Sequence, residues 1–158
     1  MPHDPSRYDE HLTLKVPFTL WLVLAFLLRH LLLLGITFMP TTGEEIMVLR
    51  DLIRPVYLAA DLLALPVAIV AARRRPQAPD WMRRLWPFGR PLLTASALVY
   101  LALLGVHLAT SGEPLVTAVD EAVLISALLN LAVIAYLWRS ALVRDLFREF
   151  PEQDGARR

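Results

Sequence analysis

Residues 17–39 read PFTLWLVLAFLLRHLLLLGITFM, and this stretch decides which class of fold the chain can adopt. A helix of about 20 apolar residues is long enough to cross the ~30 Å hydrocarbon core of a bilayer. The only strongly polar residues of the stretch are Arg29 and His30, near its centre. A charged side chain at that depth is costly, so we expect Arg29 to have a partner or a function.

Three more apolar segments follow, and the sequence predicts membrane spans over residues 17–39, 53–72, 91–110 and 116–138. The second is the weakest, because Asp61 and Pro66 interrupt it. The spans should be helices, since a lone strand would leave its backbone groups unpaired in lipid. The composition agrees, with 56% hydrophobic residues and a mean hydropathy of +0.50. We therefore predict an all-α, polytopic membrane protein with four transmembrane helices, which forms a single membrane domain over residues 1–158.

The segment 73–90 reads RRRPQAPDWMRRLWPFGR and predicts the orientation of the spans. It carries one acid and six arginines, namely Arg73, Arg74, Arg75, Arg83, Arg84 and Arg90. Basic residues concentrate in cytoplasmic loops, so this loop and both termini should be cytoplasmic. Contact with anionic lipid is a secondary role for the same arginines. The net charge of only +1 gives no reason to expect nucleic-acid binding.

The tail, residues 139–158, contains apolar residues at helical spacing between positions 140 and 150. This pattern predicts a short amphipathic helix on the cytoplasmic membrane surface. Trp81, Trp86 and Trp138 fall near the same interface, where tryptophan is often found as a belt residue.

Arg29 and Asp61 should lie at matching depths, about 20 Å and about 16 Å from the cytoplasmic face at 1.5 Å per residue. We therefore predict an Arg29–Asp61 ion pair between the first two spans. A static pair would fix the register of the helices and avoid two isolated charges. A mobile pair would act as a proton or ion relay, because ionisable groups inside a membrane are functional candidates.

Polar residues of the outer half form a second candidate site. His30 and His107 fall at a similar depth and could ligate a haem iron or a metal, with Asp51, Asp120 and Glu121 nearby at the rim. The simpler interpretation is that the histidines form hydrogen bonds within the bundle. The chain has no cysteine and no haem-attachment motif, so we expect no cofactor.

Small residues on the third and fourth spans predict close helix packing. Gly105 and Ala109 are four residues apart on the third span, and Ser126 and Asn130 are four apart on the fourth. Such faces allow helices to approach closely, and the asparagine can form a hydrogen bond across them. The contact could be between these two spans or with another subunit.

Short motifs at both ends of the chain suggest a family. They are YD at residues 8–9, LKVP at 14–17, YLWRS at 136–140, VRDLF at 143–147 and FPE at 150–152. With these motifs the chain resembles uncharacterised bacterial inner-membrane proteins grouped as a domain of unknown function, the YfeZ-like proteins. The resemblance implies a four-span protein of the bacterial inner membrane and supplies no activity.

The sequence contains no phosphate-binding loop, dinucleotide fingerprint or catalytic motif, so we do not expect an enzyme. The first hypothesis is an accessory or assembly subunit that acts through helix–helix contacts, either in a larger membrane complex or with copies of itself. The second is a small oligomeric transporter or ion pathway using Arg29 and Asp61. The third is a haem or metal carrier using His30 and His107.

Overall fold

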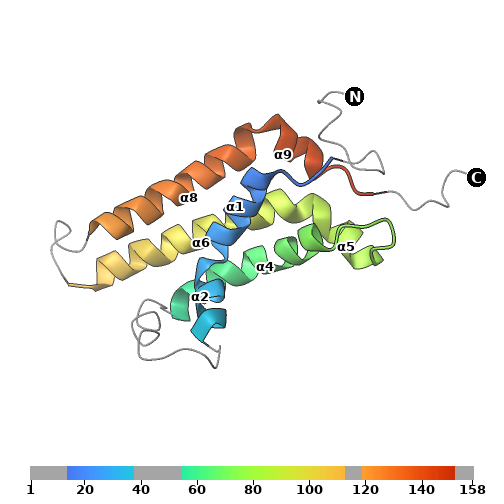
Figure 1. Cartoon of the computed structure of the whole chain (residues 1–158). Coiled ribbons are helices and arrows are strands. Elements are labelled where there is room, and N and C mark those ends of the chain that lie inside the picture. The colour runs from blue at the N-terminus through green and yellow to red at the C-terminus, as the bar shows by residue number, and fades with distance from the viewer. Residues whose placement is uncertain (1–13, 38–54, 113–118, 152–158) are drawn as a thin grey trace, which may run out of the picture.

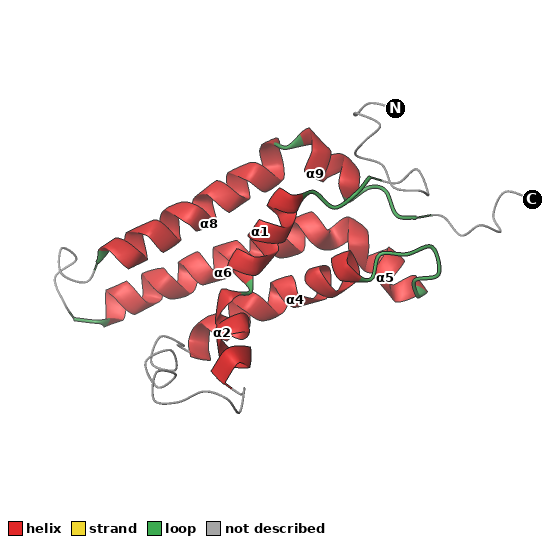
Figure 2. Ribbon diagram, viewed as in Figure 1, coloured by secondary structure: helices red, strands yellow, loops and turns green. Residues whose placement is uncertain are grey.

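The computed structural model describes residues 14–37, 55–112 and 119–151, and these residues form helices joined by short turns (Figure 2). Three helices lie side by side in the order α4 (Leu58–Ala72), α6 (Gly89–Thr110) and α8 (Glu121–Arg139) (Figure 1). Helix α1 (Phe18–Leu27) crosses this layer and contacts both α4 and α6. Thr19 on α1 also forms a hydrogen bond with the Tyr136 hydroxyl on α8, at 2.6 Å.

The helical runs Pro55–Ala72, Asp80–Thr110 and Glu121–Arg139 are each long and apolar enough to cross a membrane. The first of these includes the short turn η2 (Pro55–Tyr57), which leads into α4. A fourth crossing requires α1 and α2 (Arg29–Thr37) to count together as one bent span. The described residues therefore support three or four spans, and their apolar helices suit a membrane protein.

The first apolar segment differs from the prediction, whereas the second agrees with it. The first was expected as one continuous helix, but it consists of α1 and α2, which meet at Leu28 with an angle of 67° between them. The second was predicted as a helical span despite Asp61 and Pro66, and α4 continues without a break past Pro66. Neighbouring helices can compensate for the proline inside a bundle, and α4 has the largest buried share of the three spans.

The arginine-rich segment is more ordered than the predicted loop over residues 73–90. It contains α5 (Asp80–Leu85) and the turn η3 (Trp86–Phe88), which leads directly into α6. Trp86 was expected at the membrane interface, but it is only 1% exposed and belongs to the core. Its indole N–H donates to the Leu146 carbonyl at 2.8 Å, and its ring lies 4.7 Å from that of Phe147.

The predicted amphipathic helix is present in a shorter form, as α9 (Ala141–Leu146). Ser140 separates it from α8, and the Ser140 hydroxyl caps it by accepting the backbone N–H of Val143 at 3.3 Å. Val143, Leu146 and Phe147 are buried against the protein, whereas the prediction placed this apolar face on the membrane surface. Gly89 allows this packing, because a Cβ there would overlap the Phe147 ring.

Candidate functional site

Asp61, on α4, is the most deeply buried charged residue among those described, with 1% of its surface exposed. One carboxylate oxygen lies 3.1 Å from Nδ1 of His30. The other accepts the backbone N–H of Leu31 at 2.9 Å. An ionised carboxylate can only accept hydrogen bonds, so it requires the His30 ring to carry its proton on Nδ1. Both oxygens of Asp61 thus connect α4 to the start of α2.

The contact with Leu31 accounts for the stability of the break at Leu28. The first N–H groups of a helix have no carbonyl of their own helix to bind. Asp61 accepts one of them for α2, as an N-cap side chain would, although it belongs to a neighbouring helix. A negative charge at a helix N-terminus is also favoured by the helix dipole. Asp61 therefore stabilises the first apolar segment in its bent form.

Two tyrosines enclose the His30–Asp61 pair. The His30 ring lies 5.3 Å from the Tyr57 ring and 5.7 Å from the Tyr100 ring, measured between centroids. The two tyrosine rings are themselves 5.0 Å apart. All three rings are buried. The pair thus lies in an aromatic environment made by the start of α4, the start of α2 and the middle of α6.

Arg29 does not form the predicted pair with Asp61; His30 takes that place. The Nη1 atom of Arg29 donates to the Phe26 carbonyl at 2.9 Å. Its guanidinium carbon lies 4.4 Å from the centre of the Phe26 ring and 4.2 Å from that of Tyr100. These distances are typical of cation–π contacts. Its Nη2 atom is buried without a hydrogen-bond partner among the described residues.

The reason for this difference is the direction of neighbouring side chains on a helix. Successive residues are rotated by about 100°, so Arg29 and His30 cannot both point at Asp61. The prediction matched depths along a straight first span. A new helix begins after the break at Leu28. In its first turn, the His30 side chain and the Leu31 N–H point toward α4.

The other members of the predicted ligand site lie elsewhere. His107 follows Tyr100 by seven residues on α6, which places it about 10 Å further along the helix. Asp120 caps α8 by accepting the Val123 N–H at 2.7 Å, and Glu121 is exposed in the first turn. In the described part of the chain, no three His, Cys, Asp or Glu residues are close enough to hold a metal. Asp51 lies outside the described residues.

The predicted packing faces are only partly used within the chain. Gly105 and Ala109 are exposed, and a Cβ added at Gly105 would meet nothing within 4 Å. Asn130 is fully buried, but its amide donates to the Ser126 carbonyl of its own helix at 2.8 Å. Its Oδ1 atom has no partner among the described residues. The expected hydrogen bond across α6 and α8 is therefore not formed by the described groups.

The six arginines of the segment 73–90 fall into two groups. Three are partly buried and donate to backbone carbonyls: Arg74 to Leu14 at 2.5 Å and Glu149 at 2.6 Å, Arg83 to Pro76, and Arg90 to Leu137 at 3.1 Å. The other three, Arg73, Arg75 and Arg84, are exposed. The first group connects the segments that meet at this end of the fold.

Sequence reasoning missed the two tyrosines of the site. Tyr57 precedes Asp61 by four residues, a spacing that places two side chains on one face of a helix, so this residue could have been found. Nothing near Tyr100 in the sequence marks it as a neighbour of His30. Its position depends on how α6 packs against the break.

Comparisons with known proteins leave the activity open. A family model described as a protein of unknown function (DUF2919) matches residues 3–149. Neither the curated proteins nor the solved structures contain a match to the chain. Because the family model covers nearly the whole chain, the protein belongs to the DUF2919 family.

Proposed function

We propose that this protein is a non-enzymatic, multi-pass protein of the bacterial inner membrane that acts through helix–helix contacts. It would serve as an accessory or assembly subunit of a larger membrane complex, or associate with copies of itself. The arginine-rich segment supports an orientation with both termini in the cytoplasm. The apolar helices and the family assignment are compatible with this role.

The observation that carries the proposal is a pair of open glycines inside helices. A Cβ added at Gly35 on α2 or at Gly105 on α6 would meet nothing within 4 Å. Glycine inside a helix costs roughly 1 kcal/mol relative to alanine, and packing among the described residues does not require it at either position. In membranes, small residues allow the backbone of a second helix to approach closely. A partner helix on these faces would account for both glycines.

The exposed surroundings of these glycines fit such a contact. Leu32 lies on the same side of α2 as Gly35, at three-residue spacing, and it is exposed, as is the neighbouring Ile36. Ala109, one turn after Gly105 on α6, is exposed as well. Both faces therefore combine a small residue with apolar neighbours, as helix interfaces in membranes do.

Bulky substitutions at the open glycines test the proposal. Gly35→Leu and Gly105→Leu add volume where the described residues leave room, so each variant should fold while the contact with a partner helix is weakened. Cross-linking in native membranes, followed by purification in mild detergent, should yield a higher-mass species from the wild type and less of it from at least one variant.

Ala132→Leu on α8 is the matched control, since Ala132 is also exposed and the change adds similar volume. It should leave the cross-linked species unchanged. A wild-type protein that is a monodisperse monomer with no co-purifying partner would contradict the proposal.

A second candidate function is a proton or ion pathway, and the His30–Asp61 pair is the observation that favours it. Transporters often combine broken helices with ionisable residues inside the membrane. Asp61 would accept and release a proton, with His30 as its partner and Arg29 as a nearby fixed charge. The flux of protons or ions into proteoliposomes should then be lower for Asp61→Asn than for the wild type. Equal flux, or no flux from either, would exclude this function.

A further inference from the structure

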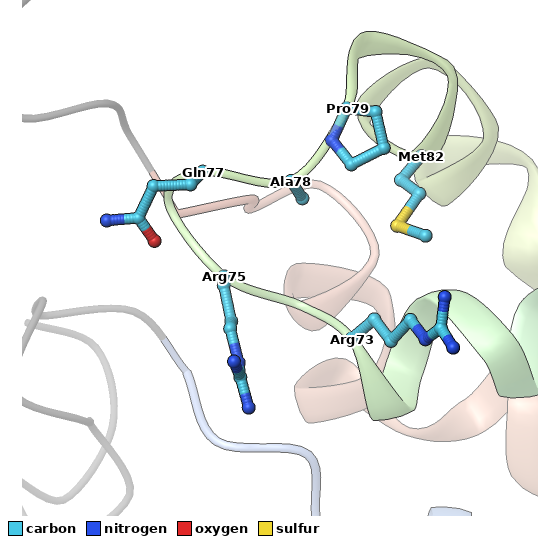
Figure 3. A pocket seen from close by; sticks show the side chains of 6 residues that line it. All are labelled: Arg73, Arg75, Gln77, Ala78, Pro79 and Met82. Atoms are coloured by element: carbon cyan, nitrogen blue, oxygen red, sulfur yellow. The ribbon is translucent and has the colours of Figure 1, made fainter.

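A hollow of about 430 Å³ opens where α4 ends and α5 begins (Figure 3). Arg73 and Arg75 line it from the chain that leaves α4, and Gln77 lines it from the turn. Ala78, Pro79 and Met82 complete the lining from the turn and from α5. Its lining thus combines two arginines and a glutamine with an apolar wall.

The two arginines of this hollow differ from the arginine between them. Arg74 is engaged with the Leu14 and Glu149 carbonyls. Arg73 and Arg75 are exposed, and neither guanidinium has a hydrogen-bond or ion-pair partner in the described part of the chain. Two unengaged arginines that line one hollow favour an anion, and the planar donor group of a guanidinium matches the oxygens of a phosphate.

The position of the hollow favours a ligand at the boundary between lipid and water. Helix α4 is apolar from Leu62 to Ala72, and Arg73 is the first charged residue after it. Trp81 and Phe88 are exposed in the same segment, as aromatic residues often are at the membrane interface. Ala78 and Met82 are buried and give the hollow an apolar side. A lipid headgroup would place its phosphate at the arginines and its glycerol backbone against this side.

We propose that the hollow lined by Arg73 and Arg75 binds a phosphate group, carried either by the headgroup of an anionic phospholipid or by free phosphate. The site involves only two of the six arginines and is separate from the helix contacts proposed above. Basic pockets at the cytoplasmic ends of membrane helices bind headgroups by the same chemistry.

Thermal unfolding of the full chain in mild detergent tests the site, because a ligand that binds only the folded state raises Tm. The probes are phosphatidylglycerol, phosphatidylcholine and inorganic phosphate, each added separately. Phosphatidylcholine carries the same phosphate but adds a positive charge. At a tenfold excess over the dissociation constant, phosphatidylglycerol should raise Tm by about 3–6 °C for a chain of this size. Phosphatidylcholine should raise it less.

The double variant Arg73→Gln with Arg75→Gln should lose this rise. The control Arg84→Gln with Arg148→Gln removes the same charge from exposed arginines outside the hollow and should keep it. A rise with inorganic phosphate alone would identify free phosphate as the source, and a rise with phosphatidylglycerol alone would identify the lipid. The proposal would be overturned if neither phosphatidylglycerol nor inorganic phosphate raised Tm. It would also be overturned if both double variants lost the rise in Tm equally.

Discussion

The two ends of the described fold accommodate charge in different ways. At the break in the first apolar segment, one buried carboxylate accepts hydrogen bonds from the His30 ring and the Leu31 backbone. At the arginine-rich end, guanidinium groups bind backbone carbonyls instead. Arg74 also lies 5.1 Å from the Trp86 ring, and Arg90 lies 4.6 Å from the Trp138 ring. The first arrangement depends on one residue, whereas the second is distributed over several.

This difference indicates where each end is vulnerable. Asp61 has two partners that would both lose their acceptor if it were replaced, and both are buried or partly buried. At the other end, the aromatic Trp86 packs against Phe147, Phe150 and Arg74. Charge therefore holds the break together, while aromatic packing holds the arginine-rich end together.

The largest effect is expected from Trp86→Ala, which removes a core side chain and its hydrogen bond to the Leu146 carbonyl. The free energy of unfolding should fall by about 3–5 kcal/mol. Titration with SDS, followed by circular dichroism, measures this loss. Trp81→Ala in the same segment is the control, since Trp81 is 50% exposed. Similar losses for both variants would contradict the assignment of Trp86 to the core.

Asp61→Leu should cause the second-largest loss of stability, because it leaves the His30 ring nitrogen and the Leu31 N–H without their acceptor. The expected loss of unfolding free energy is about 2–4 kcal/mol, from the same SDS titration. Leu62→Ala, at the exposed neighbouring position on α4, should change it by no more than about 0.5 kcal/mol. If Asp61→Leu lowered the free energy of unfolding as little as Leu62→Ala does, the break would not depend on the carboxylate.

Substitution by alanine at the two glycines of α6 should change the free energy of unfolding in different ways. Gly89→Ala forces a methyl group into the Phe147 ring and should cost about 1–3 kcal/mol. Gly105→Ala meets no neighbour among the residues that the structure describes and should be neutral or stabilising by up to about 1 kcal/mol in the detergent-solubilised monomer. The same SDS titration compares them. A loss at Gly105 that matches the loss at Gly89 would show that this face is already occupied.

The smallest effect is expected from Arg74→Lys. Lysine keeps the charge but cannot donate to the Leu14 and Glu149 carbonyls with the planar geometry of a guanidinium. The expected cost is about 1 kcal/mol. Arg73→Lys, which alters an exposed side chain, should leave the free energy of unfolding unchanged. Equal costs would mean that charge alone, rather than the bridging geometry, matters at position 74.

Hydropathy predicted the apolar helices but not their shape. The predicted segments 53–72, 91–110 and 116–138 correspond to α4, α6 and α8. The only visible breaker, Pro66, lies inside a continuous helix, whereas the break at Leu28 occurs in a stretch of leucines with no proline or glycine beside it. That break is stabilised by Asp61, more than 30 residues away in the sequence, so a local pattern could not reveal it.

The candidate site could also be predicted only in part, because it too depends on contacts between distant segments. Matching depths predicted that Asp61 would meet the centre of the first apolar segment, and Asp61 does contact His30 there. Depth could not decide between Arg29 and its neighbour His30, because that choice depends on the rotation of α2 after the break. Tyr100 comes from a distant helix and joins the site only through packing.

A comparison of two double-mutant cycles tests the central claim most directly, namely that Asp61 is held by His30 and not by Arg29. One cycle combines His30→Phe with Asp61→Leu, and the other combines Arg29→Leu with Asp61→Leu. Phenylalanine keeps a ring between the two tyrosines while removing the nitrogen that contacts the carboxylate. The coupling free energy should be about 0.5–3 kcal/mol for His30 with Asp61, and smaller for Arg29 with Asp61. A larger coupling for Arg29 would contradict this account and restore the Arg29–Asp61 ion pair.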